Sequence, residues 1–179
     1  EAFMSAVEIF KNNKLLSLNY LKYLPNKEDI VDSFYKDIRK SILMKLSISN
    51  CILSASNDWC YPFTLCRAKK AFRDLFPSSV ALELFGCDYI NSRVSCADDI
   101  LDELGVKSAG IEDALRIFSD HSEWLASQSL TWQAKFYAYI AYNLAEALDA
   151  GLLNLPCLPL SDGSFVVPNE EYVFFPLSK

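Results

Sequence analysis

Two stretches decide the fold: CILSASNDWCYPFT at residues 51–64 and CLPLSDGSFVVPNE at residues 157–170. Each contains an apolar run, a polar segment, a second apolar run and a proline, a pattern typical of a β-hairpin. In the second stretch Asp162-Gly163 favours the turn, because glycine takes a positive φ at little cost. Without a gap, a shift of 106 residues aligns three pairs: Cys51 with Cys157, Trp59 with Phe165, and Pro62 with Pro168. The two stretches therefore predict one structural device used twice.

The repeat extends beyond the hairpins. Phe-Tyr-x-x-Ile precedes each one, at residues 34–38 and 136–140, and Phe-Pro follows each one, at residues 76–77 and 175–176. The spacings differ by four residues before the hairpin and by seven after it, which indicates a degenerate duplication with variable loops. We expect an α+β fold, predominantly helical, with two helix-plus-hairpin units packed around a central apolar helix. Residues 1–90 and 91–179 would form the two units of one compact domain, cut from a larger protein.

Apolar residues at helical spacing predict most of the remaining elements. The longest expected helix, residues 131–150, is apolar around much of its circumference, so we expect it to be central and the most buried element. Gly105 is expected to end a helix in the left-handed conformation, and Gly151 to end the long one. The helices expected with it cover residues 2–11, 27–47, 67–76, 97–104 and 111–118.

The composition argues against several classes of function. Asp and Glu outnumber Lys and Arg, 23 to 17, which is unlike a nucleic-acid-binding surface. A weak nucleic-acid-binding module remains an alternative through one basic patch, which we interpret as a solvated helix face: Arg67, Lys69, Lys70 and Arg73. No apolar run is long enough to span a membrane. The chain has five glycines and no phosphate-binding glycine motif, so no nucleotide or other cofactor is expected.

Cysteine, histidine and carboxylate residues give no strong catalytic or metal signature. The six cysteines never form Cys-x-x-Cys, which argues against zinc, and no metal is expected. Buried free thiols suggest an intracellular protein, cytoplasmic or nuclear. The single histidine, His121, is interpreted as a surface or capping residue, although a small hydrolase using Cys157 or Cys66 with His121 is the alternative. A cluster of four carboxylates is interpreted as a solvated helix face: Asp98, Asp99, Asp102 and Glu103.

Aromatic residues are the remaining signal, at 13% of the chain. Those beside the hairpins either pack hairpin against helix or extend onto a protein-binding surface. The candidate partner-binding residues are Trp59, Tyr61, Phe165, Tyr172, Phe174 and Phe175.

Three features together resemble the helical repeat regions of very large sacsin-like and No Vein-like proteins. They are the helix end Leu104-Gly105-Val106, the pair Phe136-Tyr137, and the hairpin from Pro156 to Pro168; the first half matches more loosely. Such proteins carry an Hsp90-type (GHKL) ATPase module, whose motifs do not occur in these 179 residues. The resemblance implies a non-catalytic protein-interaction or scaffold segment, chaperone-like or chromatin-associated. Its partner would be another protein or another segment of the same long chain, with no membrane involved.

Overall fold

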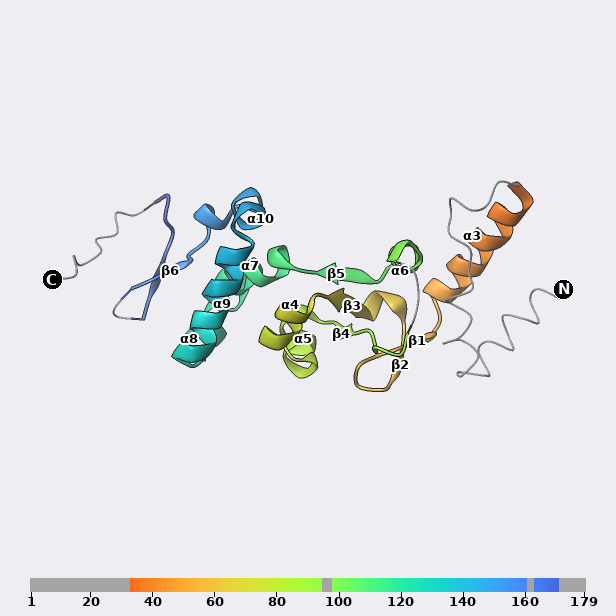
Figure 1. Cartoon of the computed structure of the whole chain (residues 1–179), viewed down its shortest axis with the longest axis horizontal. Coiled ribbons are helices and arrows are strands. Elements are labelled where there is room, and N and C mark those ends of the chain that lie inside the picture. The colour runs from red at the N-terminus through yellow and green to blue at the C-terminus, as the bar shows by residue number, and fades with distance from the viewer. Residues whose placement is uncertain (1–32, 95–97, 161–162, 171–179) are drawn as a thin grey trace. The chain divides into compact units, whose positions relative to one another are not determined.

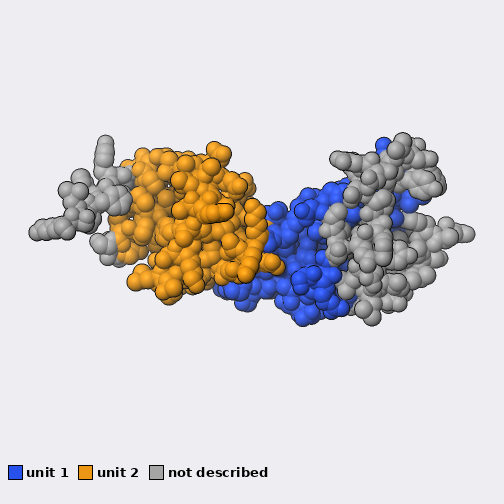
Figure 2. All heavy atoms as spheres, viewed as in Figure 1, with its two compact units in different colours: residues 1–68, 76–108 blue, residues 69–75, 109–179 orange. Residues whose placement is uncertain are grey.

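The computed structural model describes residues 33–94, 98–160 and 163–170, with the side chains of residues 33–35 left aside (Figure 1). The fold is α+β and predominantly helical, with small sheets, as the sequence predicts. The helix expected at residues 2–11 and the start of the one expected at residues 27–47 lie outside the described residues. The chain divides into two compact units, residues 1–68 with 76–108 and residues 69–75 with 109–179, so the division differs from one at residue 90 (Figure 2).

The first unit contains a helix, a hairpin, a small sheet and two further helices. In chain order its elements are α3 (Ser33–Ser47), β1 (Ile52–Leu53), β2 (Trp59–Cys60), the 3-10 turn η3 (Pro62–Thr64), β3 (Leu65–Ala68), α5 (Ser78–Phe85), β4 (Asp88–Tyr89), α6 (Asp98–Leu104) and β5 (Lys107–Ala109), whose last residue belongs to the second unit. Helices α3 and α6 pack on the hairpin through apolar side chains that include Leu43, Leu46, Ile52, Ile100 and Leu104. Gly105 follows α6 with φ +88°, the left-handed conformation expected there.

A three-stranded sheet with the order β4-β3-β5 corrects one expectation. Strands β3 and β4 are parallel, with Leu65 beside Asp88 and Cys66 beside Tyr89. Residues 67–68 therefore belong to a strand, and the helix expected at residues 67–76 is only the short α4 (Lys70–Leu75) of the second unit. The basic residues have helical spacing, but Arg67 lies in β3, the central strand of this sheet.

The second unit is mainly helical and ends in the second hairpin. Besides α4 its elements are α7 (Ile111–Asp120), α8 (Ser122–Ser127), α9 (Leu130–Tyr142), α10 (Leu144–Asp149), the 3-10 turn η4 (Leu152–Asn154), β6 (Leu158–Pro159) and β7 (Phe165–Val166). Aromatic rings fill its interior: Phe136 lies 5.4 Å from Phe118 and 5.1 Å from Trp132, between ring centroids. The indole N–H of Trp132 donates to the Leu75 carbonyl at 3.0 Å and so joins α9 to the end of α4.

The single long helix expected at residues 131–150 is wrong in two respects. It is divided at Asn143, whose backbone N–H is shared between the carbonyls of Tyr139 and Ile140 and whose side-chain amide donates to Tyr139 at 2.8 Å. It is also not the most buried element, because only Phe136, Ile140 and Ala147 are buried in α9 and α10. Tyr142, Leu144 and Leu148 are exposed, while Trp132, Tyr137 and Tyr139 are half-buried.

Both expected hairpins are present, and their strands coincide at the shift of 106 residues. Strand β1 is antiparallel to β2, and β6 is antiparallel to β7. The register is the same in both: Ile52 with Cys60 and Leu53 with Trp59 in the first hairpin, Leu158 with Val166 and Pro159 with Phe165 in the second.

The turns of the two hairpins coincide as well. In the first, the N–H of Ser54 donates to Asp58 at 2.8 Å, and the N–H of Asn57 donates to Ser54 at 3.0 Å. The same backbone bonds close the second turn, from Leu160 to Ser164 at 2.8 Å and from Gly163 to Leu160 at 3.1 Å. The two turns thus share one hydrogen-bond pattern as well as one length.

Candidate functional site

An aromatic pair is exposed directly after the first hairpin. Tyr61 and Phe63 flank Pro62 at the start of η3, and their rings stack with centroids 5.4 Å apart. Pro62 is fully buried, whereas Tyr61 is 41% and Phe63 56% exposed. The buried proline anchors the turn, and its two neighbours therefore project outward on either side of it.

Helix α3 packs against η3 and also has exposed apolar side chains at its C-terminal end. Met44 and Ile48, near the C-terminal end of the helix, are 65% and 73% exposed. We use the name α3–η3 face for the exposed apolar residues at the ends of these two contacting elements: Met44, Ile48, Tyr61 and Phe63. Large apolar side chains gathered on adjoining elements are a common feature of protein-binding surfaces.

The structure does not bring the six candidate partner-binding residues together at one site. Tyr61 lies on the α3–η3 face. Trp59 and Phe165 occupy matched positions in β2 and β7, and both are half-buried. The other three, Tyr172, Phe174 and Phe175, lie outside the described residues. Sequence reasoning missed Met44, because helical spacing places it on the buried side of its helix. It did not single out Ile48, and Phe63 is not among the six candidates.

The acidic residues of α6 are exposed, as expected of a solvated helix face, and they are also paired with arginines. The side chain of Arg39, on α3, is 7% exposed and lies 2.6 Å from the Glu103 carboxylate and 3.8 Å from that of Asp99. Arg67, on β3, bonds the carboxylates of Asp98 and Asp102. Two arginines from different elements thus hold the helix along both of its acidic edges.

This pairing also bears on nucleic-acid binding through Arg67 and its basic neighbours. The guanidinium of Arg67 bonds two carboxylates and the Asp98 carbonyl, at 2.8 Å for the last. A guanidinium already neutralised in this way has little capacity left for a phosphate group. The basic patch is therefore smaller than the sequence indicates.

The thiols have environments that disfavour nucleophilic chemistry. Burial is the main cause of a raised pKa for the thiols of Cys157 and Cys60, and it keeps them protonated. A nucleophilic cysteine needs a lowered pKa. Cys66, the other candidate nucleophile, is fully buried in the first unit, whereas His121 belongs to the second. Within the described residues, no group of three or more His, Cys, Asp or Glu side chains is arranged to hold a metal ion.

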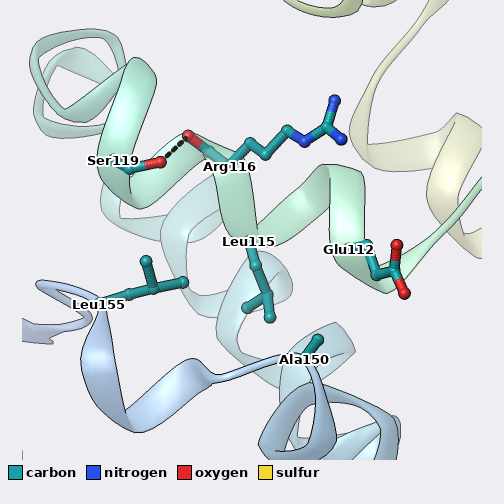
Figure 3. A pocket seen from close by; sticks show the side chains of 6 residues that line it. All are labelled: Glu112, Leu115, Arg116, Ser119, Ala150 and Leu155. Atoms are coloured by element: carbon teal, nitrogen blue, oxygen red, sulfur yellow. Dashed lines mark hydrogen bonds between the residues drawn. The ribbon is translucent and has the colours of Figure 1, made fainter.

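Two hollows lie on the second unit. One, of about 310 Å³, has an apolar floor formed by Leu115, Ala150 and Leu155, while the charged groups of Glu112 and Arg116 point away from it (Figure 3). The hydroxyl of Ser119 donates to the Arg116 carbonyl at 3.2 Å, as the dashed line shows. The lining of this hollow thus combines three apolar residues with three polar or charged ones.

The second hollow, of about 410 Å³, is a shallow groove between α4 and α9. Its lining is mostly apolar, with one charge from each helix, and comprises Ala71, Asp74, Leu75, Lys135, Ala138, Tyr139 and Tyr142. Tyr142 is 90% exposed at the edge of this groove.

No helix in the described parts of the chain is both long and apolar enough to cross a bilayer.

Comparison with known proteins gives one informative likeness. Over 174 residues the sequence is 22% identical to Protein NO VEIN of Arabidopsis thaliana. The chain is similar to one segment of a much longer protein. The match covers 87% of this chain and 6% of the length of NO VEIN. No protein-family model matches the sequence, and no solved structure matches it.

Proposed function

We propose that this chain is a non-catalytic protein-interaction segment of a larger protein of the sacsin-like or No Vein-like type. The observation that carries the proposal is the α3–η3 face, where four large apolar side chains are between 41% and 73% exposed. The similarity of the chain to a small part of NO VEIN supports the proposal that it is a segment of a longer protein. An Hsp90-type ATPase module elsewhere in that chain, and a scaffold or chaperone-like role, belong to the same proposal.

We also propose that the two helix-plus-hairpin regions are copies of one unit. The strand register, the turn bonds and the left-handed turn residue coincide at the shift of 106 residues. The correspondence continues past each hairpin. The N–H of Thr64 donates to the Tyr61 carbonyl at 3.0 Å, and the N–H of Glu170 donates to the Val167 carbonyl at 3.1 Å. Each of these turns contains the matched proline, Pro62 or Pro168. A duplicated unit gives a long protein repeated binding elements of similar shape.

An intracellular location forms part of this proposal. Among the described cysteines, Cys60 and Cys157 are free thiols, and Cys157 is buried. Free thiols in a protein interior are typical of a reducing compartment.

The test of the proposal is quantitative affinity capture with three forms of the chain. The parent is compared with the double variant Tyr61→Glu, Phe63→Glu, which places two charges on the α3–η3 face. Leu82→Glu, at a similarly exposed leucine of α5 (57%), is the matched control. All three forms are first checked for equal helix content and unfolding midpoint.

The proposal predicts a protein recovered in near-stoichiometric amount by the parent and by Leu82→Glu, and lost by the double variant. Recovery of the same proteins in the same amounts by all three forms would contradict it. In that case the apolar face would be a contact within the longer chain.

A further inference from the structure

In the first hairpin, strand β1 is paired on both of its sides. Strand β2 pairs with one edge of β1, and an extended segment at residues 89–91 runs antiparallel to the other. Two backbone bonds hold this segment: Ala55 donates to the Tyr89 carbonyl at 2.7 Å, and Asn91 donates to the Leu53 carbonyl at 2.9 Å. The outer edge of β1 is therefore covered at this position.

The corresponding edge of the second hairpin is more exposed. Leu53 is 5% and Ser54 1% exposed under the covering segment. Their counterparts after the shift of 106 residues are Pro159, which is exposed, and Leu160, which is half-buried. Among the residues that the structure describes, β6 pairs only with β7. The same edge is thus covered in one copy and open in the described part of the other.

Proline in β6 does not prevent pairing along this edge. A proline lacks the N–H group but keeps its carbonyl. In the first hairpin, position 53 contributes its carbonyl to the covering segment, as the acceptor of the Asn91 N–H. Pro159 therefore retains the carbonyl group that the first hairpin uses, and a proline is tolerated in an edge strand such as β6.

We propose that the outer edge of β6 binds an extended segment of a partner polypeptide, which adds an antiparallel strand and donates an N–H to the Pro159 carbonyl. An unpaired edge is a ready template for such a strand. This site is separate from the α3–η3 face of the proposed function, since it lies on the second unit.

The first hairpin also indicates the side chains of the partner segment. The side-chain amide of Asn91 donates to the Ser54 carbonyl at 3.1 Å, beside the turn bond that the same carbonyl accepts. The Leu160 carbonyl accepts the matched turn bond from the Gly163 N–H, and it can accept a second hydrogen bond from a side-chain amide in the same way. The partner segment is therefore a short extended strand that places an Asn opposite Pro159 and Leu160, as residues 88–91 place Asn91 opposite Leu53 and Ser54.

The test uses the whole chain and a synthetic peptide of residues 86–93 in which Cys87 is replaced by serine. Binding is followed by NMR through the carbonyl carbon of Pro159, which is observed through the amide of Leu160. Two N-methylated peptides are compared with the parent peptide. N-methyl-Asn91 removes the N–H that would bond Pro159. N-methyl-Ile90 is the matched control, because in the first unit the Ile90 N–H points the other way, toward the Cys66 carbonyl at 3.0 Å.

The proposal predicts a saturable shift of the Pro159 carbonyl resonance. N-methyl-Asn91 should weaken peptide binding by about fivefold or more, the effect of one backbone hydrogen bond, and N-methyl-Ile90 by less than about twofold. An unchanged Pro159 resonance at high peptide concentration, or equal loss with both methylated peptides, would overturn it. The proposal would also be overturned if deleting residues 171–179 shifted the Pro159 carbonyl resonance in the absence of peptide. In that case the edge of β6 would already be paired with the C-terminal residues of the same chain.

Discussion

Asn57 and Gly163 occupy the same position in the two hairpin turns, and both have a left-handed backbone, with φ of 68° and 86°. An L-residue is strained by about 1–2 kcal/mol in this region, whereas glycine enters it freely and asparagine does so with less strain than most residues. Glycine and asparagine are therefore two sequence solutions to one backbone requirement, which the two hairpins share.

Gly163→Ala should lower the free energy of unfolding of the second unit by about 1 kcal/mol. A Cβ at this position meets no atom within 4 Å, so backbone conformation is the whole of the expected cost. Gly110→Ala, in the same unit, is the control: it also meets no atom within 4 Å, and its φ is −162°. Urea unfolding of both variants makes the comparison, and equal losses would contradict the argument.

Arg39→Ala should destabilise the first unit more than Arg67→Ala. The Arg39 side chain is 7% exposed, whereas that of Arg67 is 23% exposed and its two carboxylate partners are largely in solvent. We expect a loss of about 2 kcal/mol for Arg39→Ala, from lost packing and a partly buried ion pair, and less than about 1 kcal/mol for Arg67→Ala. Chemical denaturation at low and at high salt checks both values, with the Arg67 effect shrinking in salt. A larger loss for Arg67→Ala would contradict the account.

The buried carboxylate of Asp88 should make the stability of the first unit depend on pH. Burial alone would raise its pKa, but hydrogen bonds from Ser56, Ser78, the Tyr89 amide and Ser54 outweigh burial and hold the pKa below the ordinary value of 3.8. A lowered folded-state pKa stabilises the protein above the unfolded-state value, and this stability is lost as pH falls through the folded-state pKa.

Asp88→Asn should therefore cost about 1–3 kcal/mol at neutral pH, and the gap to the parent should narrow below about pH 4. Chemical denaturation of both proteins from neutral pH to below about pH 4 measures this difference in the free energy of unfolding. A gap that stays constant, or widens as the pH falls, would show that the carboxylate does not act in this way.

Tyr137→Phe should loosen the connection between α9 and the second hairpin. The hydroxyl of Tyr137 donates to the Cys157 carbonyl at 2.9 Å, and burial raises its pKa well above the ordinary range. Losing this bond should cost about 1 kcal/mol. Tyr142→Phe, at a tyrosine that is 90% exposed, should leave the unfolding midpoint unchanged. A similar effect of the two substitutions would contradict a role for the hydroxyl.

The hairpins were predictable because their signals are local. An apolar pair, a polar turn and a closing proline lie within a dozen residues, and comparing the two copies located their strands without any long-range information. Gly105 was predictable for the same reason. The exposed aromatic at Tyr61 could be suggested in this way, but its exposure depends on Pro62 packing into the core.

The remaining features depend on contacts between distant residues. Strand β3 could not be distinguished from a helix by its own spacing, since its conformation follows from pairing with β4, more than twenty residues later. The pairing of Arg39 with Glu103 joins residues separated by 64 positions, and neither residue signals the other. The break at Asn143 lies within a pattern that remains helical on both sides, so periodicity alone does not reveal it.

The most direct test of the account is amide hydrogen exchange at Ser54 and Leu160. Their N–H groups make the same turn bond, each 2.8 Å long, to Asp58 and Ser164. If one hairpin is covered by residues 89–91 and the other is open, Ser54 should exchange at least about 100-fold more slowly than Leu160 after correction for intrinsic rates. Equal protection of the two amides would contradict the claim that the second hairpin presents an open edge.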